Sequence, residues 1–93
     1  MAVKHAEGSN KKHNVFLYAL STCFWCKKTK ALLDEMGVCY DYEYVDLLAG
    51  EEKDGILREV EIFNPGGGFP VTVINKTKAI VGFKPEEIKA ALE

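Results

Sequence analysis

The spacing of apolar side chains along the chain predicts alternating strands and helices. Residues 15–20 form an uninterrupted apolar run, which is typical of a strand covered on both faces. From Trp25 onward apolar residues recur at helical spacing until Gly37, and glycine commonly ends a helix in the left-handed conformation. Between Val38 and Val45 tyrosines alternate with mostly polar residues. That alternation predicts a strand, and its polar face favours an edge position in the sheet.

The second half of the chain continues the pattern. Residues 51–63 carry one apolar stripe at helical spacing, and Pro65 ends that helix. Residues 71–75 and 78–81 predict a hairpin, because two apolar runs flank a short polar turn. Pro85 is a favourable first residue for a last short helix.

Length and element order define the domain organisation. The predicted order is strand–helix–strand–helix–strand–strand–helix, and a chain of 93 residues is long enough for one hydrophobic core. We therefore expect a single α/β domain over residues 14–93. Residues 1–13 are polar and small, which predicts a flexible N-terminal tail.

Composition excludes several classes of function. The chain has 12 basic and 14 acidic side chains and a net charge of -2, so it has no cationic field for nucleic acid. A hydrophobic fraction of 47% argues against disorder. The longest apolar run is far too short to span a bilayer. We expect a soluble cytoplasmic protein that binds neither nucleic acid nor membrane.

Three cysteines change the picture. Cys23 and Cys26 form a C-x-x-C motif where the first strand leads into the first helix, and Cys39 stands apart. A secreted disulfide scaffold would carry more cysteines in an even number. A structural zinc needs four ligands, and the spacing of His5, His13 and Cys39 matches no common zinc pattern. At a strand–helix junction the motif favours redox chemistry, and we predict no metal site.

The position of the two motif cysteines predicts their roles. Cys23 lies at the start of the helix, where free N–H groups and the helix dipole favour an anion. We interpret Cys23 as the nucleophile that attacks a target disulfide and Cys26, one turn deeper, as the resolving thiol. Two buried, inert cysteines are the plainer alternative, which this junction disfavours. Cys39 is interpreted as a structural residue that behaves as a small apolar side chain.

Three landmarks together resemble the glutaredoxin family of the thioredoxin superfamily, over about residues 14–93. They are Cys23-Phe24-Trp25-Cys26, Phe69-Pro70-Val71 and Gly82-Phe83-Lys84-Pro85-Glu86. The resemblance implies a thioredoxin-like fold, with a four-stranded mixed sheet flanked by three helices and a cis peptide before Pro70 facing the dithiol. It also implies a monomeric dithiol–disulfide oxidoreductase that holds no bound cofactor besides its own Cys23–Cys26 disulfide.

The same resemblance suggests a surface for the substrate. The residues expected to converge beside Cys23 are Phe24, Trp25, Phe69, Pro70, Val71, Gly82 and Phe83. Phe24 and Trp25 replace the Pro-Tyr pair common in glutaredoxins. We expect Phe24 to form an apolar surface for a partner, whereas Trp25 is equally well interpreted as a core residue.

The electron donor is predicted from two departures from the family pattern. Glutaredoxins that use glutathione usually carry a basic residue where this chain has Leu20, and a Gly-Gly then Asp signature where it has Gly82-Phe83-Lys84. The Gly-Phe-Lys-Pro turn looks more like that of NrdH-type redoxins, which serve ribonucleotide reductase and take electrons from thioredoxin reductase. Weak glutathione dependence is therefore expected. The alternatives are a glutathione-dependent glutaredoxin, or a dimer that holds a [2Fe-2S] cluster through Cys23.

Overall fold

The computed structural model of the chain describes residues 3–92. Its elements follow in the order β1 (Lys4–Ala6), β2 (Val15–Ala19), α1 (Phe24–Glu35), β3 (Tyr40–Tyr44), the short 3-10 helix η1 (Val45–Leu47), α2 (Gly50–Phe63), β4 (Val71–Ile74), β5 (Lys78–Val81) and α3 (Pro85–Leu92). From β2 onward this order matches the prediction. Among the described residues no helix is long and apolar enough to cross a membrane.

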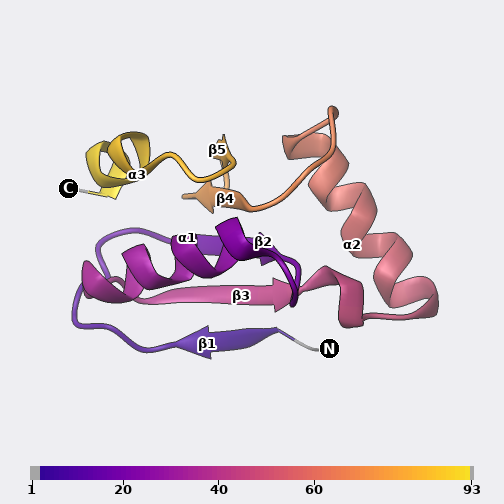
Figure 1. Cartoon of the computed structure of the whole chain (residues 1–93), viewed down its shortest axis with the longest axis horizontal. Coiled ribbons are helices and arrows are strands. Elements are labelled where there is room, and N and C mark those ends of the chain that lie inside the picture. Colours follow the sequence, from indigo (N-terminus) through magenta and orange to yellow (C-terminus); the bar gives the residue numbers. More distant parts are fainter. Residues whose placement is uncertain (1–2, 93) are drawn as a thin grey trace.

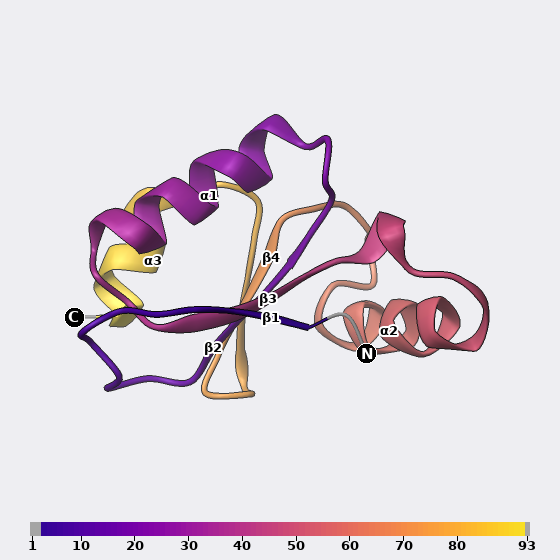
Figure 2. The same ribbon diagram turned by 90° about the horizontal axis from the view of Figure 1, so that it is seen from below.

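The strands form one mixed sheet in the order β1-β3-β2-β4-β5. Strands β2 and β3 run parallel, joined by α1, and every other neighbouring pair is antiparallel. Helices α1 and α3 cover one face of the sheet and α2 covers the other (Figures 1 and 2). This is the thioredoxin-like arrangement of a mixed sheet between three helices.

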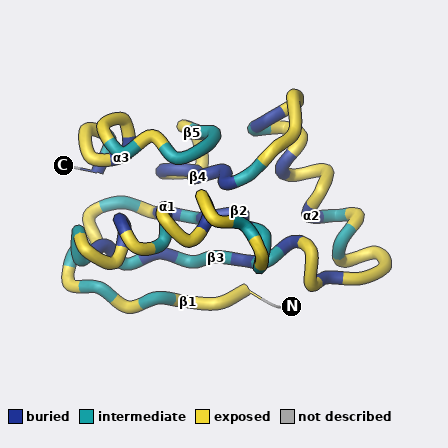
Figure 3. The backbone as a smooth tube through the Cα atoms, in the orientation of Figure 1, coloured by how far each residue is buried: buried dark blue, intermediate teal, exposed yellow. Residues whose placement is uncertain are grey.

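Each face of the sheet has its own hydrophobic core. On the α1 and α3 side, Leu17 of β2 packs with Leu33 and Ile88, which are all completely buried. On the α2 side, Tyr18 and Val71 pack with Ile56 and Val60. The central strands β2 and β4 are consequently the most deeply buried part of the sheet, and β1 is the most exposed strand (Figure 3).

The predicted flexible tail is wrong over part of its length. Residues 4–6 form β1, which pairs antiparallel with β3, so the sheet has five strands rather than four. Asn10 continues the attachment, because its N–H donates to the Gly37 carbonyl at 2.9 Å and its carbonyl accepts from Cys39 N–H at 3.0 Å. A Cβ on Gly8 would lie 2.5 Å from the Gly37 carbonyl oxygen, so this approach requires glycine. Residues 1–2 of the predicted tail lie outside the described residues.

Strand β3 is also internal rather than at the sheet edge, since β1 covers its outer side. The polar face of β3 that suggested an edge is covered in part by α2. Glu43 on that face is completely buried, near Tyr18 and Ile56. The alternation of polar and apolar residues therefore predicted the strand correctly, but the edge position inferred from it is wrong.

Candidate active site

Cys23 occupies the N-cap of α1. Its backbone is extended, with φ -89° and ψ 119°, and its Sγ accepts a hydrogen bond from the Cys26 N–H at 3.1 Å. The sulfur therefore stands where a capping oxygen normally stands, facing the unpaired N–H groups of the first helical turn. Partial positive charge at a helix N-terminus stabilises an anion, so this position supports a thiolate on Cys23.

Cys26 lies one turn deeper and is only 1% exposed. Burial is the largest cause that raises the pKa of Cys26 to about 12, and its hydrogen bond and electrostatic interaction with Cys23 contribute to the same rise. In the reduced protein, Cys26 therefore stays protonated at neutral pH. Neither cysteine is in a disulfide in this structure.

The turn that carries Cys23 is held by Asp46, a residue that the sequence analysis missed. Ser21 donates its N–H to Asp46 Oδ1 at 2.8 Å and its hydroxyl to Oδ2 at 2.5 Å. These bonds lower the pKa of Asp46 from its ordinary value. The position of Asp46 could have been predicted. Neighbouring parallel strands end at the same edge of a sheet, and Ala19 at the end of β2 pairs with Tyr44 at the end of β3. A polar residue just after Tyr44 is thus expected beside the turn after Ala19.

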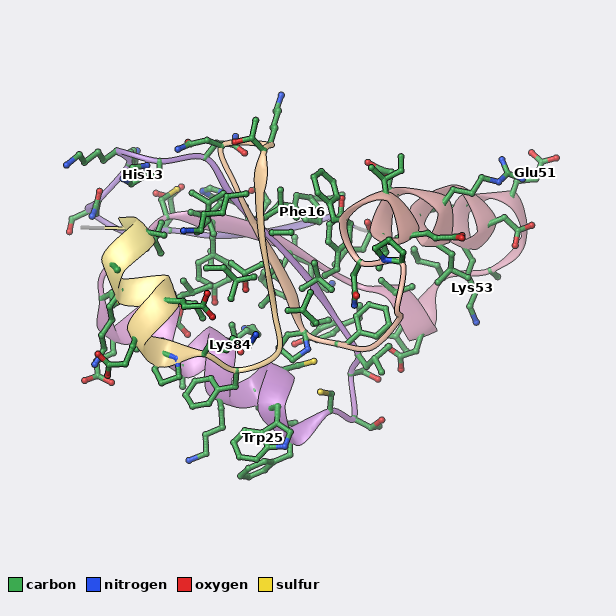
Figure 4. All side chains as sticks on the ribbon, turned by 90° about the horizontal axis from the view of Figure 1, so that it is seen from above. His13, Phe16, Trp25, Glu51, Lys53 and Lys84 are labelled. Carbon is green, nitrogen blue, oxygen red and sulfur yellow. The ribbon has the colours of Figure 1, made fainter. Side chains whose placement is uncertain are left out.

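Three aromatic side chains form an apolar surface next to Cys23, which we call the aromatic rim: Phe24, Trp25 and Phe83. Phe24 is 60% exposed and Trp25 54% exposed, so the core interpretation of Trp25 is wrong. The Trp25 ring stacks on Phe83 with centroids 5.8 Å apart, and Phe24 meets Trp25 edge-on at 5.0 Å (Figure 4 labels Trp25 at the rim). The stack joins the start of α1 to the turn before α3.

The Phe69–Pro70 segment completes this side of the domain. The Phe69–Pro70 peptide is cis, and the Pro70 carbonyl accepts the Gly82 N–H at 2.8 Å. Phe69, Cys23 and Phe83 are all partly buried against the same hydrophobic core. Val71 is different, because it is fully buried between β2 and β5 and its side chain belongs to the core on the α2 side. Its side chain is therefore not part of the surface around Cys23.

The expectation of weak glutathione dependence rests on two positions, Leu20 and Lys84. Neither has a side chain of the charge that would bind glutathione there. Leu20 is half-buried against the core on the α2 side, and its carbonyl accepts the Cys23 N–H at 3.3 Å. Lys84 is exposed and pairs with Glu87 at 3.8 Å. The turn before α3 thus presents an ammonium group where a carboxylate would be needed to hold the α-amino group of a glutamyl residue.

Cys39 and the two histidines lie away from this site. Cys39 precedes β3 and Cys23 follows β2, so the two lie at opposite ends of a parallel strand pair about 17 Å long. Figure 4 shows His13 and Trp25 on opposite sides of the molecule. Cys39 Sγ lies 3.4 Å from His5 Nε2. A zinc site that combines the dithiol with His5, His13 or Cys39 is therefore excluded by the topology.

A thioredoxin-like fold with a dithiol at the start of its first helix defines a class of redox proteins, and comparison with known proteins identifies the family. The Glutaredoxin family model matches residues 15–78. The crystal structure of the glutaredoxin from Methanosarcina mazei Go1 is 50% identical, with a TM-score of 0.90 over 99% of this chain and 88% of that chain. Methanoredoxin from Methanosarcina acetivorans is 52% identical, with a TM-score of 0.82 over 85% of this chain and 83% of that chain.

A match to a curated relative agrees with these structures over a shorter region. Glutaredoxin 1 of Rickettsia prowazekii (strain Madrid E) is 38% identical over 47 residues, which are 50% of this chain and 50% of that protein. The match thus spans about half the length of that relative. The chain belongs to the glutaredoxin family, whose members are oxidoreductases that act by thiol–disulfide exchange. The resemblance inferred from the three sequence landmarks is confirmed.

Proposed function

We propose that this protein reduces disulfide bonds in protein substrates through Cys23 and Cys26. The Cys23 thiolate attacks one sulfur of the target disulfide, which forms a mixed disulfide and releases the other target sulfur as a thiolate. Cys26 then loses its proton and attacks Cys23 Sγ, which releases the second target sulfur. Two electrons and two protons pass to the target in all, and a Cys23–Cys26 disulfide remains for an external reductant to reduce.

The observation that carries this proposal is the different environment of the two sulfurs. Cys23 accepts an N–H at a helix N-terminus and is partly exposed, while Cys26 is buried with a raised pKa. Part of that rise comes from Cys23 itself, through a hydrogen bond and the charge of its sulfur. Once Cys23 is in a neutral mixed disulfide, these contributions disappear and Cys26 loses its proton more easily. The second attack is thereby favoured only after the first has occurred.

The aromatic rim supports a protein substrate rather than a charged peptide. Phe24 and Trp25 place exposed apolar area beside Cys23, and aromatic side chains are enriched in the centres of protein interfaces. We propose that an extended segment carrying the disulfide lies over the rim, with its backbone beside Phe69 and Pro70. A target of the ribonucleotide reductase kind fits this mode of binding, because its disulfide is presented on a protein chain.

We further propose thioredoxin reductase, rather than glutathione, as the source of electrons. Leu20 and Lys84 replace two charged contacts for glutathione, and charge-assisted hydrogen bonds contribute about 1.5–3 kcal/mol each where they are desolvated. A dithiol must also be kept reduced between cycles, which is consistent with action in the cytoplasm.

The test is a disulfide reduction assay run with each reductant separately: glutathione plus its reductase, and thioredoxin reductase with NADPH. We expect insulin reduction with thioredoxin reductase and slow turnover of glutathione mixed disulfides. The double variant Leu20→Lys/Lys84→Asp should increase glutathione-dependent activity at least fivefold and leave the other assay unchanged. Lys78→Asp, an exposed lysine on β5, is the charge-matched control for Lys84→Asp. Fast glutathione turnover by the unmodified protein would contradict the proposal about the donor.

The visible spectrum of the same preparation tests the cluster alternative. A [2Fe-2S] cluster is held by four thiolate ligands, and of the motif pair only Cys23 is accessible. Two chains would therefore supply two ligands, and the other two would have to come from small thiols. We propose that the protein works without such a cluster and expect no absorption bands above 400 nm in freshly purified protein.

A further inference from the structure

A second group of reactive side chains lies at the end of the sheet opposite the dithiol. In the β1–β3 pair, His5 stands opposite Asp41, and the same register places Glu7 opposite Cys39. Since side chains alternate between faces with period two, these four residues share one face of the sheet. Helix α2 covers this face only farther along, at Glu43. At the end near Cys39 the face opens into a hollow of about 310 Å³, lined by His5, Cys39 and Asp41 among others.

The distances within the group converge on one atom, His5 Nε2. His5 Nδ1 donates to Asp41 Oδ1 at 2.6 Å, which fixes the orientation of the imidazole ring. His5 Nε2 then lies 2.8 Å from Glu7 Oε1 and 3.4 Å from Cys39 Sγ. One ligand atom from each of His5, Glu7 and Cys39 lies within 4.8 Å of the others. A histidine whose second nitrogen is held by a carboxylate is the usual arrangement of a metal-binding histidine.

The donor set selects the metal. Imidazole nitrogen, thiolate sulfur and carboxylate oxygen are the ligands of Zn²⁺, whereas Mg²⁺ and Ca²⁺ prefer oxygen alone. With Zn–S of about 2.3 Å and Zn–N of about 2.0–2.1 Å, a tetrahedral site places sulfur and nitrogen about 3.5 Å apart. The 3.4 Å between Cys39 and His5 is close to this value. We propose that His5, Glu7 and Cys39 bind a zinc ion, with Asp41 as the positioning residue behind His5.

The backbone around the group holds its members in place without the metal. The segment that follows Glu7 is fixed against residues 37–39 by the close approach of Gly8 and by both Asn10 backbone hydrogen bonds. Zinc binding replaces the proton on His5 Nε2 and the proton on Cys39, and a water from the open hollow completes four ligands. The ion joins β1, the shortest strand, to β3. The site therefore stabilises the sheet edge and takes no part in disulfide exchange.

The experiment uses the full chain with Cys23→Ser/Cys26→Ser, so that the dithiol cannot hold the ion. Zn²⁺ is titrated in competition with a chromophoric chelator, and Co²⁺ is used as a spectroscopic substitute. We expect one ion per chain, a near-ultraviolet thiolate-to-cobalt band and the visible bands of a tetrahedral site. Zinc should also raise the melting temperature by several degrees. Absence of binding in this variant would overturn the proposal, and binding by the unmodified protein alone would then assign the ion to the dithiol.

Single substitutions in that background identify the ligands. His5→Gln and Cys39→Ser should each weaken zinc binding at least tenfold, and Cys39→Ser should remove the thiolate band while the circular dichroism spectrum stays native. Asp41→Asn should weaken binding about tenfold, as expected for a residue behind a ligand. The matched control is His13→Gln, since His13 lines the same hollow, its Nδ1 pairs with Asn75 at 3.0 Å, and it is not one of the three residues whose ligand atoms converge. Equal loss in His13→Gln, or unchanged binding in His5→Gln, would contradict the assignment.

Discussion

Cys23, at the N-cap of α1, and Cys39, just before β3, are both partly buried cysteines, and their surroundings give them different chemistry. Cys23 accepts a backbone N–H at the start of α1 and borders the exposed rings of Phe24 and Trp25. Cys39 lies before β3, next to His5 and near Glu7. The first environment offers hydrogen-bond donors to a thiolate and apolar area to a partner. The second offers further ligand atoms. Residue type and exposure alone therefore do not decide what a cysteine does in this fold.

The largest effect expected from this comparison is on catalysis. Cys23→Ser should reduce disulfide reductase activity at least ~10³-fold, because a hydroxyl at the same position is not ionised at neutral pH and cannot form the mixed disulfide. Cys39→Ser should retain activity near that of the unmodified protein, since Cys39 lies at the opposite end of β2 and β3. Insulin reduction by both variants, with the same reductant, measures the difference. Loss of activity in Cys39→Ser would place that thiol in the reaction.

The second prediction concerns the order in which the motif thiols react. Because the pKa of Cys26 is raised to about 12, roughly one in 10⁴ of its thiols is ionised at pH 8. Iodoacetamide should therefore label Cys23 first throughout the range from pH 6 to pH 9. Cys26 should react readily only after unfolding. Mass spectrometry of tryptic peptides measures both rates, and faster labelling of Cys26 would reverse the assigned roles. Cys26→Ser should in addition accumulate a stable mixed disulfide with its substrate.

Most of the fold could be predicted from local sequence patterns, and the parts that could not depend on pairing between distant segments. The run at residues 15–20, the glycine at position 37 and the C-x-x-C spacing are all local signals, and each identified its element correctly. Strand β1 has only three residues, Lys4–Ala6, too few to show a period. Its existence depends on β3, which lies more than thirty residues farther along the chain.

The residues of the candidate site likewise fall into those that the sequence predicts and those that only the structure brings together. Cys23 and Cys26 could be found from their spacing, because a strand–helix junction is visible in the sequence, whereas Pro70 was expected at the site only from the family resemblance. The exposure of Trp25 could not, since an aromatic residue at helical spacing fits a core equally well until its stacking on Phe83 is known. The grouping of His5, Glu7 and Cys39 required the register of β1 against β3. Side chains that converge through strand pairing thus carry no signature in sequence spacing.

The third prediction tests the aromatic rim as the surface for protein substrates. Trp25→Ala removes an exposed ring and its stack on Phe83. We expect about a tenfold decrease in kcat/KM for insulin reduction, which corresponds to ~1.4 kcal/mol, with most of the change in KM. Reduction of a small aromatic disulfide should change much less. The matched control is Ile62→Ala on α2, which removes an even more exposed apolar side chain (76%) from a helix that does not carry the dithiol. An equal decrease in both variants would contradict a specific role of the rim.

The smallest expected effect is on the turn that carries Cys23, and it depends on pH. Hydrogen bonds from Ser21 lower the pKa of Asp46 below its ordinary value of 3.8, so Asp46 stabilises the fold when it is ionised. This contribution is fully present above pH 3.8 and is lost as the pH falls through the lower pKa of the folded state. Asp46→Asn should therefore lower the melting temperature at pH 6. The decrease should be only a few degrees, because the carboxylate is exposed and its bonds are screened by water.

Scanning calorimetry from pH 6 to pH 2.5 should show that the difference in melting temperature between the two proteins becomes smaller as the pH falls. Asp54→Asn, an exposed acid on α2, changes the net charge equally and should show no such trend. A difference that stays constant with pH would mean that Asp46 acts through its shape and hydrogen bonds rather than through its charge.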